Sequence, residues 1–172
     1  MDKHASFQNL YIKAGLKITS LRIEPESGEY GASRFNVNGY NVAFRIAKTT
    51  PRKIGQFVTI WKRLNPTDEI MPIDITDNID FIVINVFDEI NLGQFIFDKK
   101  ILLEKDIFSK NSRGGKRAFR VYPPWAEPFS SQALKTQKWQ SSYFFDLMKD
   151  ETININQVRR LFKSIMPHSN QL

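Results

Sequence analysis

The stretch that decides the fold is residues 38–63, NGYNVAFRIAKTTPRKIGQFVTIWKR. Its first two residues, Asn38 and Gly39, tolerate the positive φ of a tight turn. Residues 34–37 before the turn alternate polar and apolar, which is typical of a strand with one buried face. The alternation continues after the turn, where one face carries Val42, Phe44 and Ile46. The sequence therefore predicts a β-hairpin here.

A helix is predicted directly after this hairpin, over residues 51–63. Thr50 and Pro51 form a favourable helix start, because proline suits the first helical position. Apolar residues then recur at helical spacing, at Ile54, Phe57, Val58, Trp61 and Leu64. The β-branched residues among 57–60 would also suit a strand. If the helix starts at Pro51, its first N–H groups provide a phosphate site.

The whole chain, residues 1–172, is expected to form one domain, because its length suits one and no repeat or linker divides it. We expect an N-terminal helix at about 6–22, a core at about 23–148 and a C-terminal helix at about 154–166. Within the core, the apolar run at 81–87 predicts a strand covered on both faces, with 94–97 as its antiparallel neighbour. The other predicted elements are a short helix capped by Asp98 and reaching Lys105, a strand at 118–122, and a helix from Ser130 or Ser131 to about Met148.

The composition points to an anionic partner and excludes several kinds of site. The formal net charge is +7 and the pI is about 9.6, which favours nucleic-acid binding. Cysteine is absent, so disulfides, a thiolate nucleophile and a Cys-type zinc site are excluded. The two histidines, His4 and His168, lie near the chain ends, so we expect no metal site. The sequence has no signal-peptide core and no apolar run of about 18 residues, so we expect a cytoplasmic protein without a membrane partner.

Two basic segments supply the candidate nucleic-acid contacts. No acidic residue occurs from 41 to 67 or from 107 to 126, so neither segment is neutralised locally. Lysine and arginine hold phosphates, and neighbouring aromatic rings can stack on bases. We expect the two segments to form the two walls of a groove. The candidate residues are Arg45, Lys48, Arg52, Lys53, Gln56 and Arg63 in the first segment and Arg113, Lys116, Arg117 and Arg120 in the second.

The order of helix, hairpin, helix and buried strand resembles the restriction-endonuclease-like superfamily. In that fold an acidic-x-Lys triplet at a strand end helps to hold Mg²⁺ and to position the nucleophile. Here the triplet is Ile46-Ala47-Lys48, so the lysine is present and the carboxylate is missing. A metal-dependent nuclease would need a displaced carboxylate, Glu24 or Glu26 with Lys48, and would use Mg²⁺ or Mn²⁺. We therefore expect binding rather than catalysis, with no cofactor.

A narrower resemblance rests on several blocks in one order. The chain resembles the MepB family of small bacterial proteins through EPESGEYGA, FRIAKTTPRKIGQFVTIWKR, DFIVINV, GQFIF, RVYPPW and SQALKTQKWQ. The blocks span roughly residues 23–144. The resemblance implies an α/β fold of the restriction-endonuclease-like kind, with a mixed sheet flanked by helices. It also implies nucleic-acid binding with no settled enzymatic activity.

The leading prediction is a nucleic-acid-binding protein that contacts phosphates through a basic groove, with DNA rather than RNA as its partner. The metal-dependent nuclease is one alternative. A protein-interaction module or a dimer is another, because residues 65–98 contain seven acidic residues before Asp98 and no basic one. Such a stretch could bind the basic segments of the same chain or of a partner.

Overall fold

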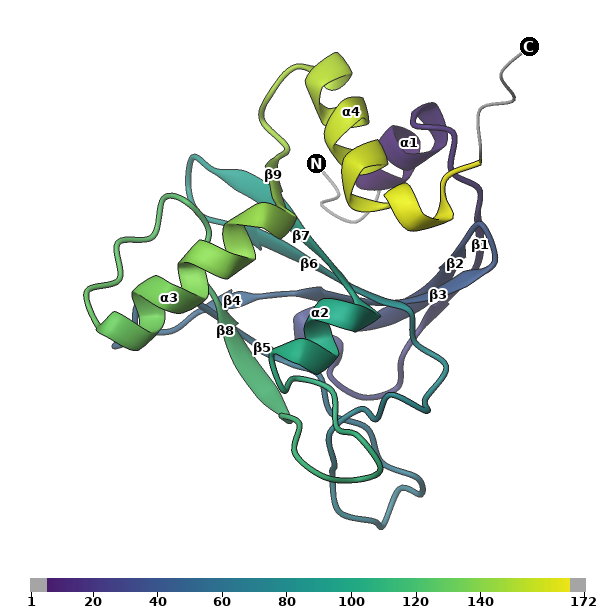
Figure 1. Cartoon of the computed structure of the whole chain (residues 1–172), viewed down its shortest axis with the longest axis vertical. Coiled ribbons are helices and arrows are strands. Elements are labelled where there is room, and N and C mark those ends of the chain that lie inside the picture. Colours follow the sequence, from purple (N-terminus) through teal and green to yellow (C-terminus); the bar gives the residue numbers. More distant parts are fainter. Residues whose placement is uncertain (1–5, 168–172) are drawn as a thin grey trace.

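The computed structural model describes residues 6–167 as two β-sheets and four α-helices (Figure 1). The larger sheet has the strand order β1-β2-β3-β6-β7-β9, and the smaller sheet has the order β4-β5-β8. The strands are β1 (Ile18–Ile23), β2 (Ser33–Val37), β3 (Tyr40–Ile46), β4 (Lys48–Thr49), β5 (Gln56–Thr59), β6 (Phe81–Phe87), β7 (Leu92–Asp98), β8 (Ala118–Val121) and β9 (Phe144–Asp146). The helices are α1 (Ser6–Lys13), α2 (Lys99–Glu104), α3 (Ser131–Gln140) and α4 (Glu151–Leu161), with 3-10 turns η1 (Gly28–Tyr30), η2 (Ser141–Tyr143) and η3 (Lys163–Ile165).

The predicted hairpin is confirmed. β2 and β3 pair antiparallel, and Asn38 and Gly39 between them have φ of 50° and 85°. β3 then pairs parallel with β6, whereas the other neighbours in the larger sheet pair antiparallel. The predicted strand at 81–87 and its antiparallel neighbour are confirmed as β6 and β7. The chain therefore has the mixed α/β architecture expected from its sequence.

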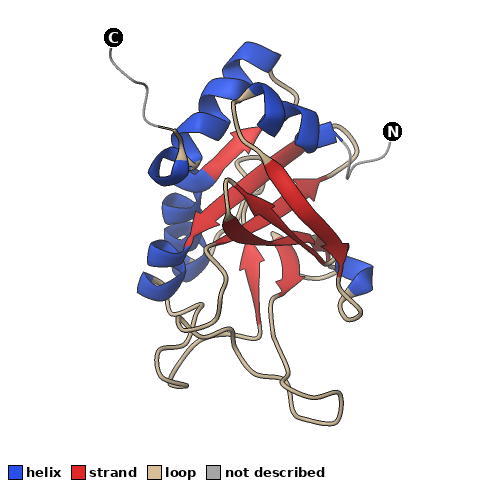
Figure 2. Ribbon diagram, turned by 90° about the vertical axis from the view of Figure 1, so that its right-hand side faces the viewer, coloured by secondary structure: helices blue, strands red, loops and turns tan. Residues whose placement is uncertain are grey.

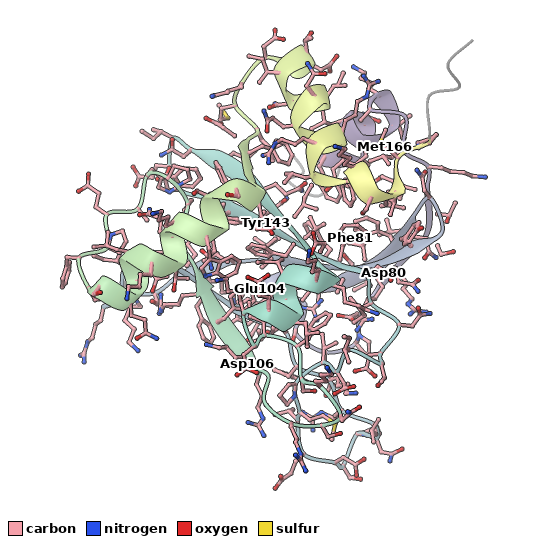
Figure 3. The ribbon with its side chains drawn as sticks, in the orientation of Figure 1. Asp80, Phe81, Glu104, Asp106, Tyr143 and Met166 are labelled. Atoms are coloured by element: carbon pink, nitrogen blue, oxygen red, sulfur yellow. The ribbon has the colours of Figure 1, made fainter. Side chains whose placement is uncertain are left out.

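The larger sheet has a hydrophobic core on each face. On one face, α1 and α4 lie side by side over β2, β3 and β6; Phe81 belongs to this core, and Met166 packs against it (Figures 1 and 3). On the other face, α2 and the smaller sheet pack on β6 and β7, with Trp139 of α3 at the margin. In Figure 2 the α-helices lie at the left and top of the strands.

The predicted helix over 51–63 is wrong. Residues 56–59 form β5, which pairs antiparallel with β4 on one side and with β8 on the other. Gln56 and Val58 are buried while Phe57 and Thr59 are half-buried, which is the period of two that a strand requires. The phosphate site expected at the start of that helix is therefore absent from this position.

Two other predicted helices are too long. α1 ends at Lys13, Gly15 turns the chain with φ of 90°, and β1 occupies the second half of the predicted 6–22 helix. α3 ends at Gln140 and is followed by η2 and β9. The predicted starts of α2 and α3 agree with the structure. Asp98 accepts a hydrogen bond from Ile101 N at the start of α2, and Ser130 caps α3.

The C-terminal helix and the strand at 118–122 are confirmed as α4 and β8, with ends shifted by a few residues. No helix in residues 6–167 is both long enough and apolar enough to cross a membrane. His4 and His168 lie outside the described residues.

Asp74 holds two long loops together. Its buried carboxylate accepts hydrogen bonds from Ser112 N at 2.9 Å and from Ser109 Oγ at 2.7 Å. The N–H and hydroxyl of Thr76 also donate to it. These donors, with Ser112 first, hold the pKa of Asp74 well below its usual range, because they stabilise the ionised carboxylate.

Candidate nucleic-acid interface

The structure separates the predicted cations into a buried set and an exposed set. Arg45 is only 2% exposed, and it donates hydrogen bonds to Phe44 O and Thr59 O. Its guanidinium also lies 2.7 Å from the Glu24 carboxylate, which pairs with Arg34 as well, at 2.5 Å. We call Glu24, Arg34 and Arg45 the Glu24 centre. Arg45 is therefore a structural residue, and its prediction as a nucleic-acid contact is wrong.

Burial and pairing act in opposite directions on Arg45. Burial lowers the pKa of Arg45 from its ordinary value, and the neighbouring Glu24 carboxylate raises it. A buried arginine retains its charge only when a carboxylate and hydrogen-bond acceptors surround it. Glu24, Phe44 O and Thr59 O supply that surrounding here.

The carboxylates considered for a nuclease are both paired with arginines. Glu24 is held by the two arginines of its centre, and Glu26 lies 3.0 Å from Arg63 Nε. Lys48 is exposed, and its Nζ lies 4.7 Å from the centre of the Tyr30 ring. Residues 6–167 contain no group of three or more His, Cys, Asp or Glu side chains that could hold a metal ion. A nuclease reaction through these glutamates would first have to break ion pairs that the fold uses.

Two further candidates have structural contacts. Gln56 is 5% exposed, and its Nε2 donates to Phe87 O at 2.6 Å and to Thr49 Oγ1 at 3.2 Å. It therefore ties β5 to the end of β6. Arg63 donates to the carbonyls of Pro66 and Asp68 and lies over the Trp61 ring, so it holds the loop that follows β5.

Five cationic side chains line a groove between α3 and β8. Two hollows of about 300 and 280 Å³ adjoin here and share Arg120, Tyr122, Ser130 and Ala133 in their walls. We call them together the α3 groove. Among the described residues that line it, no side chain is acidic. The charged side chains in its walls are Arg52, Lys53, Lys105, Lys116 and Arg120.

Arg120 fixes one wall of the α3 groove. Its NH2 donates to Thr50 Oγ1 at 2.6 Å, and its NH1 donates to Gly55 O at 3.3 Å. These bonds hold the loop that carries Arg52 and Lys53 against β8. The loop also depends on Gly55, whose φ is +82° and where a Cβ atom would lie 2.7 Å from the Tyr122 ring.

Two glutamines of α3 fix the other wall. Gln140 is fully buried; its Oε1 accepts from Tyr122 N at 2.8 Å, and its Nε2 donates to Arg120 O at 2.9 Å. Its amide therefore bonds the free edge of β8 as a neighbouring strand would. Gln137 Nε2 donates to the carbonyls of Pro123 and Ala126 and fixes the loop after β8.

The start of α3 faces the same groove. Ser130 Oγ accepts a hydrogen bond from Ala133 N, and the first turn contains no acidic residue. The other N–H groups of a first turn have no partner within the helix and carry a partial positive charge. A helix N-terminus therefore lies beside Arg52 and Lys53 after all, although it belongs to α3 and not to residues 51–63.

Aromatic rings accompany the cations. Lys48, Phe57 and Arg120 are neighbours in register across the smaller sheet, and the Arg120 guanidinium lies 5.8 Å from the centre of the Phe57 ring. Phe129 lines the α3 groove and is 86% exposed, so its ring is open to contact. Trp139 instead packs against Phe97 at 5.5 Å between ring centres.

The second basic segment is only partly in the groove. Lys116 and Arg120 line it, whereas Arg113 and Arg117 do not. Arg117 Nε donates to Ile70 O at 3.0 Å, and Arg113 lies in an exposed turn. Sequence reasoning missed Lys105, for which no local signal exists, and Phe129. It predicted the cap at Ser130 but gave it no role in binding.

Two of three comparisons with known proteins point to the same family. The family model described as MepB-like matches residues 24–146. The chain is also similar to the crystal structure of MepB, with 34% sequence identity and a TM-score of 0.74 over 87% of this chain and 100% of that one. A search of curated proteins gave no match. On the family match and this structural similarity, the chain belongs to the MepB-like family.

Proposed function

We propose that this protein binds nucleic acid through the α3 groove, mainly by contacts with phosphates. One observation carries the proposal: five cationic side chains and no acidic one line the groove among the described residues. In a chain of net charge +7 that also contains 18 acidic residues, a groove of one sign concentrates positive potential. Phosphodiester backbones are the ligands that such a groove attracts.

The geometry of the groove supports a bound strand. Arg52 and Lys53 line one hollow, Lys105 and Lys116 line the other, and Arg120 lies where the two meet. Successive phosphates could therefore meet cations along the groove, and the start of α3 adds N–H donors between them. The exposed Phe129 ring offers a surface on which a base can stack.

The proposal includes a relationship to restriction-endonuclease-like proteins. Its support is the order of the larger sheet, in which the antiparallel strands β1, β2 and β3 are followed by the parallel strand β6. The connection from β3 to β6 contains β4 and β5 where that fold was expected to have a helix. We propose a non-catalytic binding protein of the cytoplasm that acts on DNA rather than RNA and needs no metal ion.

A binding titration tests the proposal. Labelled single- and double-stranded DNA and RNA are titrated between about 50 and about 200 mM salt, in EDTA and then in Mn²⁺. We expect binding in EDTA that weakens steeply with salt, and an intact substrate in both conditions. Salt-independent binding, or no binding to any of the four, would contradict the proposal.

Two triple variants of equal charge locate the surface. Arg52→Ala, Lys53→Ala and Lys116→Ala together should weaken binding roughly tenfold or more and lower the salt slope by about 3, because each phosphate contact contributes about 1. The matched control is Lys110→Ala, Arg113→Ala and Arg117→Ala, whose residues lie outside the groove. Equal losses in the two variants would show an effect of net charge rather than of this groove.

A further inference from the structure

A second cavity lies away from the α3 groove, on the polar side of β1, β2 and β3. Its volume is about 420 Å³, within the range of small-molecule sites. α1 and α4 cover the opposite face of these strands, and Lys62, Asp77 and Asn78 close the cavity from the loop side. In Figure 1, β1–β3 lie at the right of the molecule and α3 at the left.

Polar side chains without partners line this cavity. Within residues 6–167, the side chains of five of them make no hydrogen bond or ion pair to another residue. Three of these side chains are exposed and two are half-buried, so a ligand in the cavity can reach their donors and acceptors without displacing a bond within the protein. The five residues are Ser20, Arg22, Asn36, Asn41 and Asn78.

Two arginines face the cavity from paired positions. Arg22 on β1 is the register partner of Arg34 on β2, so both side chains leave the same face, about 5 Å apart at Cβ. Like charges in this position repel. Arg34 Nε is bonded to Glu24, which leaves its two terminal nitrogens available, and Arg22 has no ion pair. An anion between the two guanidiniums would relieve the repulsion and could accept paired hydrogen bonds from each.

The rest of the lining fits a polar anion. The next rung of the hairpin places Asn36 opposite Asn41, and their amides can both donate to and accept from hydroxyl groups. Three cations and one carboxylate line the cavity. That carboxylate, Asp77, pairs with Lys62 and also accepts from Asp74 N, so these two charges compensate each other. Arg34 pairs with Glu24, so Arg22 supplies the uncompensated positive charge among the described residues that line the cavity.

We infer that this cavity binds a small organic phosphate. The phosphate lies between Arg22 and Arg34, and the hydroxyl or base groups of the ligand bond to Asn36, Asn41 and Asn78. A nucleotide and a sugar phosphate share this chemistry, and the experiment below separates them. The site is independent of nucleic-acid binding, because it shares no lining residue with the α3 groove.

Calorimetric titration of the full chain tests the inference. The probes are inorganic phosphate, ribose 5-phosphate, adenosine monophosphate and adenosine. We expect at least one phosphate ester to bind and adenosine to bind at least tenfold more weakly. Preference for the nucleotide or for the sugar phosphate names the ligand class. If none of the phosphates binds at millimolar concentration, or if adenosine binds as tightly, the inference fails.

Variants show whether the cavity is the site. Arg22 is exposed and unpaired, so Arg22→Gln should leave the melting temperature unchanged and weaken phosphate-ester binding at least tenfold. Lys17→Gln is the matched control, because Lys17 is an exposed cation next to β1 that does not line the cavity. Its affinity should stay within twofold. Unchanged affinity in Arg22→Gln, or an equal loss in Lys17→Gln, would overturn the inference. The triple variant of the α3 groove should bind the phosphate ester normally, which separates this test from that of nucleic-acid binding.

Discussion

The Glu24 centre and the α3 groove both contain cationic side chains, but only the Glu24 centre pairs them with a carboxylate. In the Glu24 centre, Arg45 is buried and is bonded to a carboxylate and two carbonyls. In the α3 groove, Arg52 and Lys53 are exposed and no acidic residue shares their wall. The three residues belong to one basic stretch of sequence, so burial and pairing decide what each cation does, and local composition does not.

The largest expected effect is on the free energy of unfolding, when the carboxylate of the Glu24 centre is removed. Glu24→Gln removes the charge that compensates Arg45, and leaving a buried charge unpaired costs about 3 kcal/mol or more. Urea denaturation should show this loss of unfolding free energy, while the folded variant keeps its affinity for nucleic acid. Glu29→Gln, an exposed glutamate in the same loop, should change stability by less than about 0.5 kcal/mol. A loss below about 1 kcal/mol in Glu24→Gln would show that Arg45 does not depend on this carboxylate.

A smaller effect is expected where the loop meets β8. Gly55→Ala adds a Cβ atom 2.7 Å from the Tyr122 ring and 2.9 Å from Val121 O, so we expect a loss of about 2 kcal/mol together with weaker nucleic-acid binding. Gly39→Ala is the control, since its φ is also positive but no atom lies within 4 Å of the added Cβ. Backbone strain alone should cost about 1 kcal/mol there and leave binding unchanged. If the two changes weaken binding equally, the 50–55 loop takes no specific part in nucleic-acid binding.

A still smaller effect is expected at the start of α3, which lies in the wall of the α3 groove. Ser130→Ala removes the cap on Ala133 N and should cost about 1 kcal/mol. It should also weaken nucleic-acid binding a few-fold, because the first turn then frays beside Arg120. Ser131→Ala, one residue later and without a cap bond, should change both quantities little. If the two variants bind alike, the helix start takes no part in binding.

Asp74 extends the comparison to a carboxylate that accepts hydrogen bonds from neutral donors. Its contribution to stability is expected to depend on pH. Because hydrogen bonds lower the pKa of Asp74 in the folded protein, its contribution to stability is complete above the ordinary Asp pKa of about 4. The contribution is lost as pH falls through the lowered folded value. The difference in unfolding free energy between wild type and Asp74→Asn should therefore be constant from pH 7 to about pH 5 and narrow below about pH 4. A difference that stays constant down to about pH 3 would contradict this account.

The sequence predicted the elements whose signals are local. The Asn38-Gly39 turn, the apolar run of β6 and the caps at Asp98 and Ser130 are all found in the structure. The prediction of a helix over 51–63 was wrong because β5 pairs with β8, which lies about 60 residues later in the chain. A helical spacing of apolar residues cannot reveal a partner so distant.

Four of the ten residues predicted as nucleic-acid contacts line the α3 groove, and their role in binding stays a prediction. Cations in both basic segments do line one groove, as the gaps in acidic residues indicated. The burial of Arg45 could not be read from the sequence, because it depends on Glu24 being carried in by a loop. Lys105 could not be found either, since only the packing of α2 beside α3 and β8 brings it to the groove.

The side-chain pairing of Gln140 with the edge of β8 has a consequence for how the chain is made. The loop with Arg52 and Lys53 leaves the ribosome well before β8 and α3, which complete the groove around it. Until β8 arrives, β5 has an open edge, and until Gln140 arrives, β8 has one in turn. Arg52 and Lys53 are therefore synthesised before the strand and the helix that complete the groove around them. The α3 groove is complete only after residue 140 has been added to the growing chain.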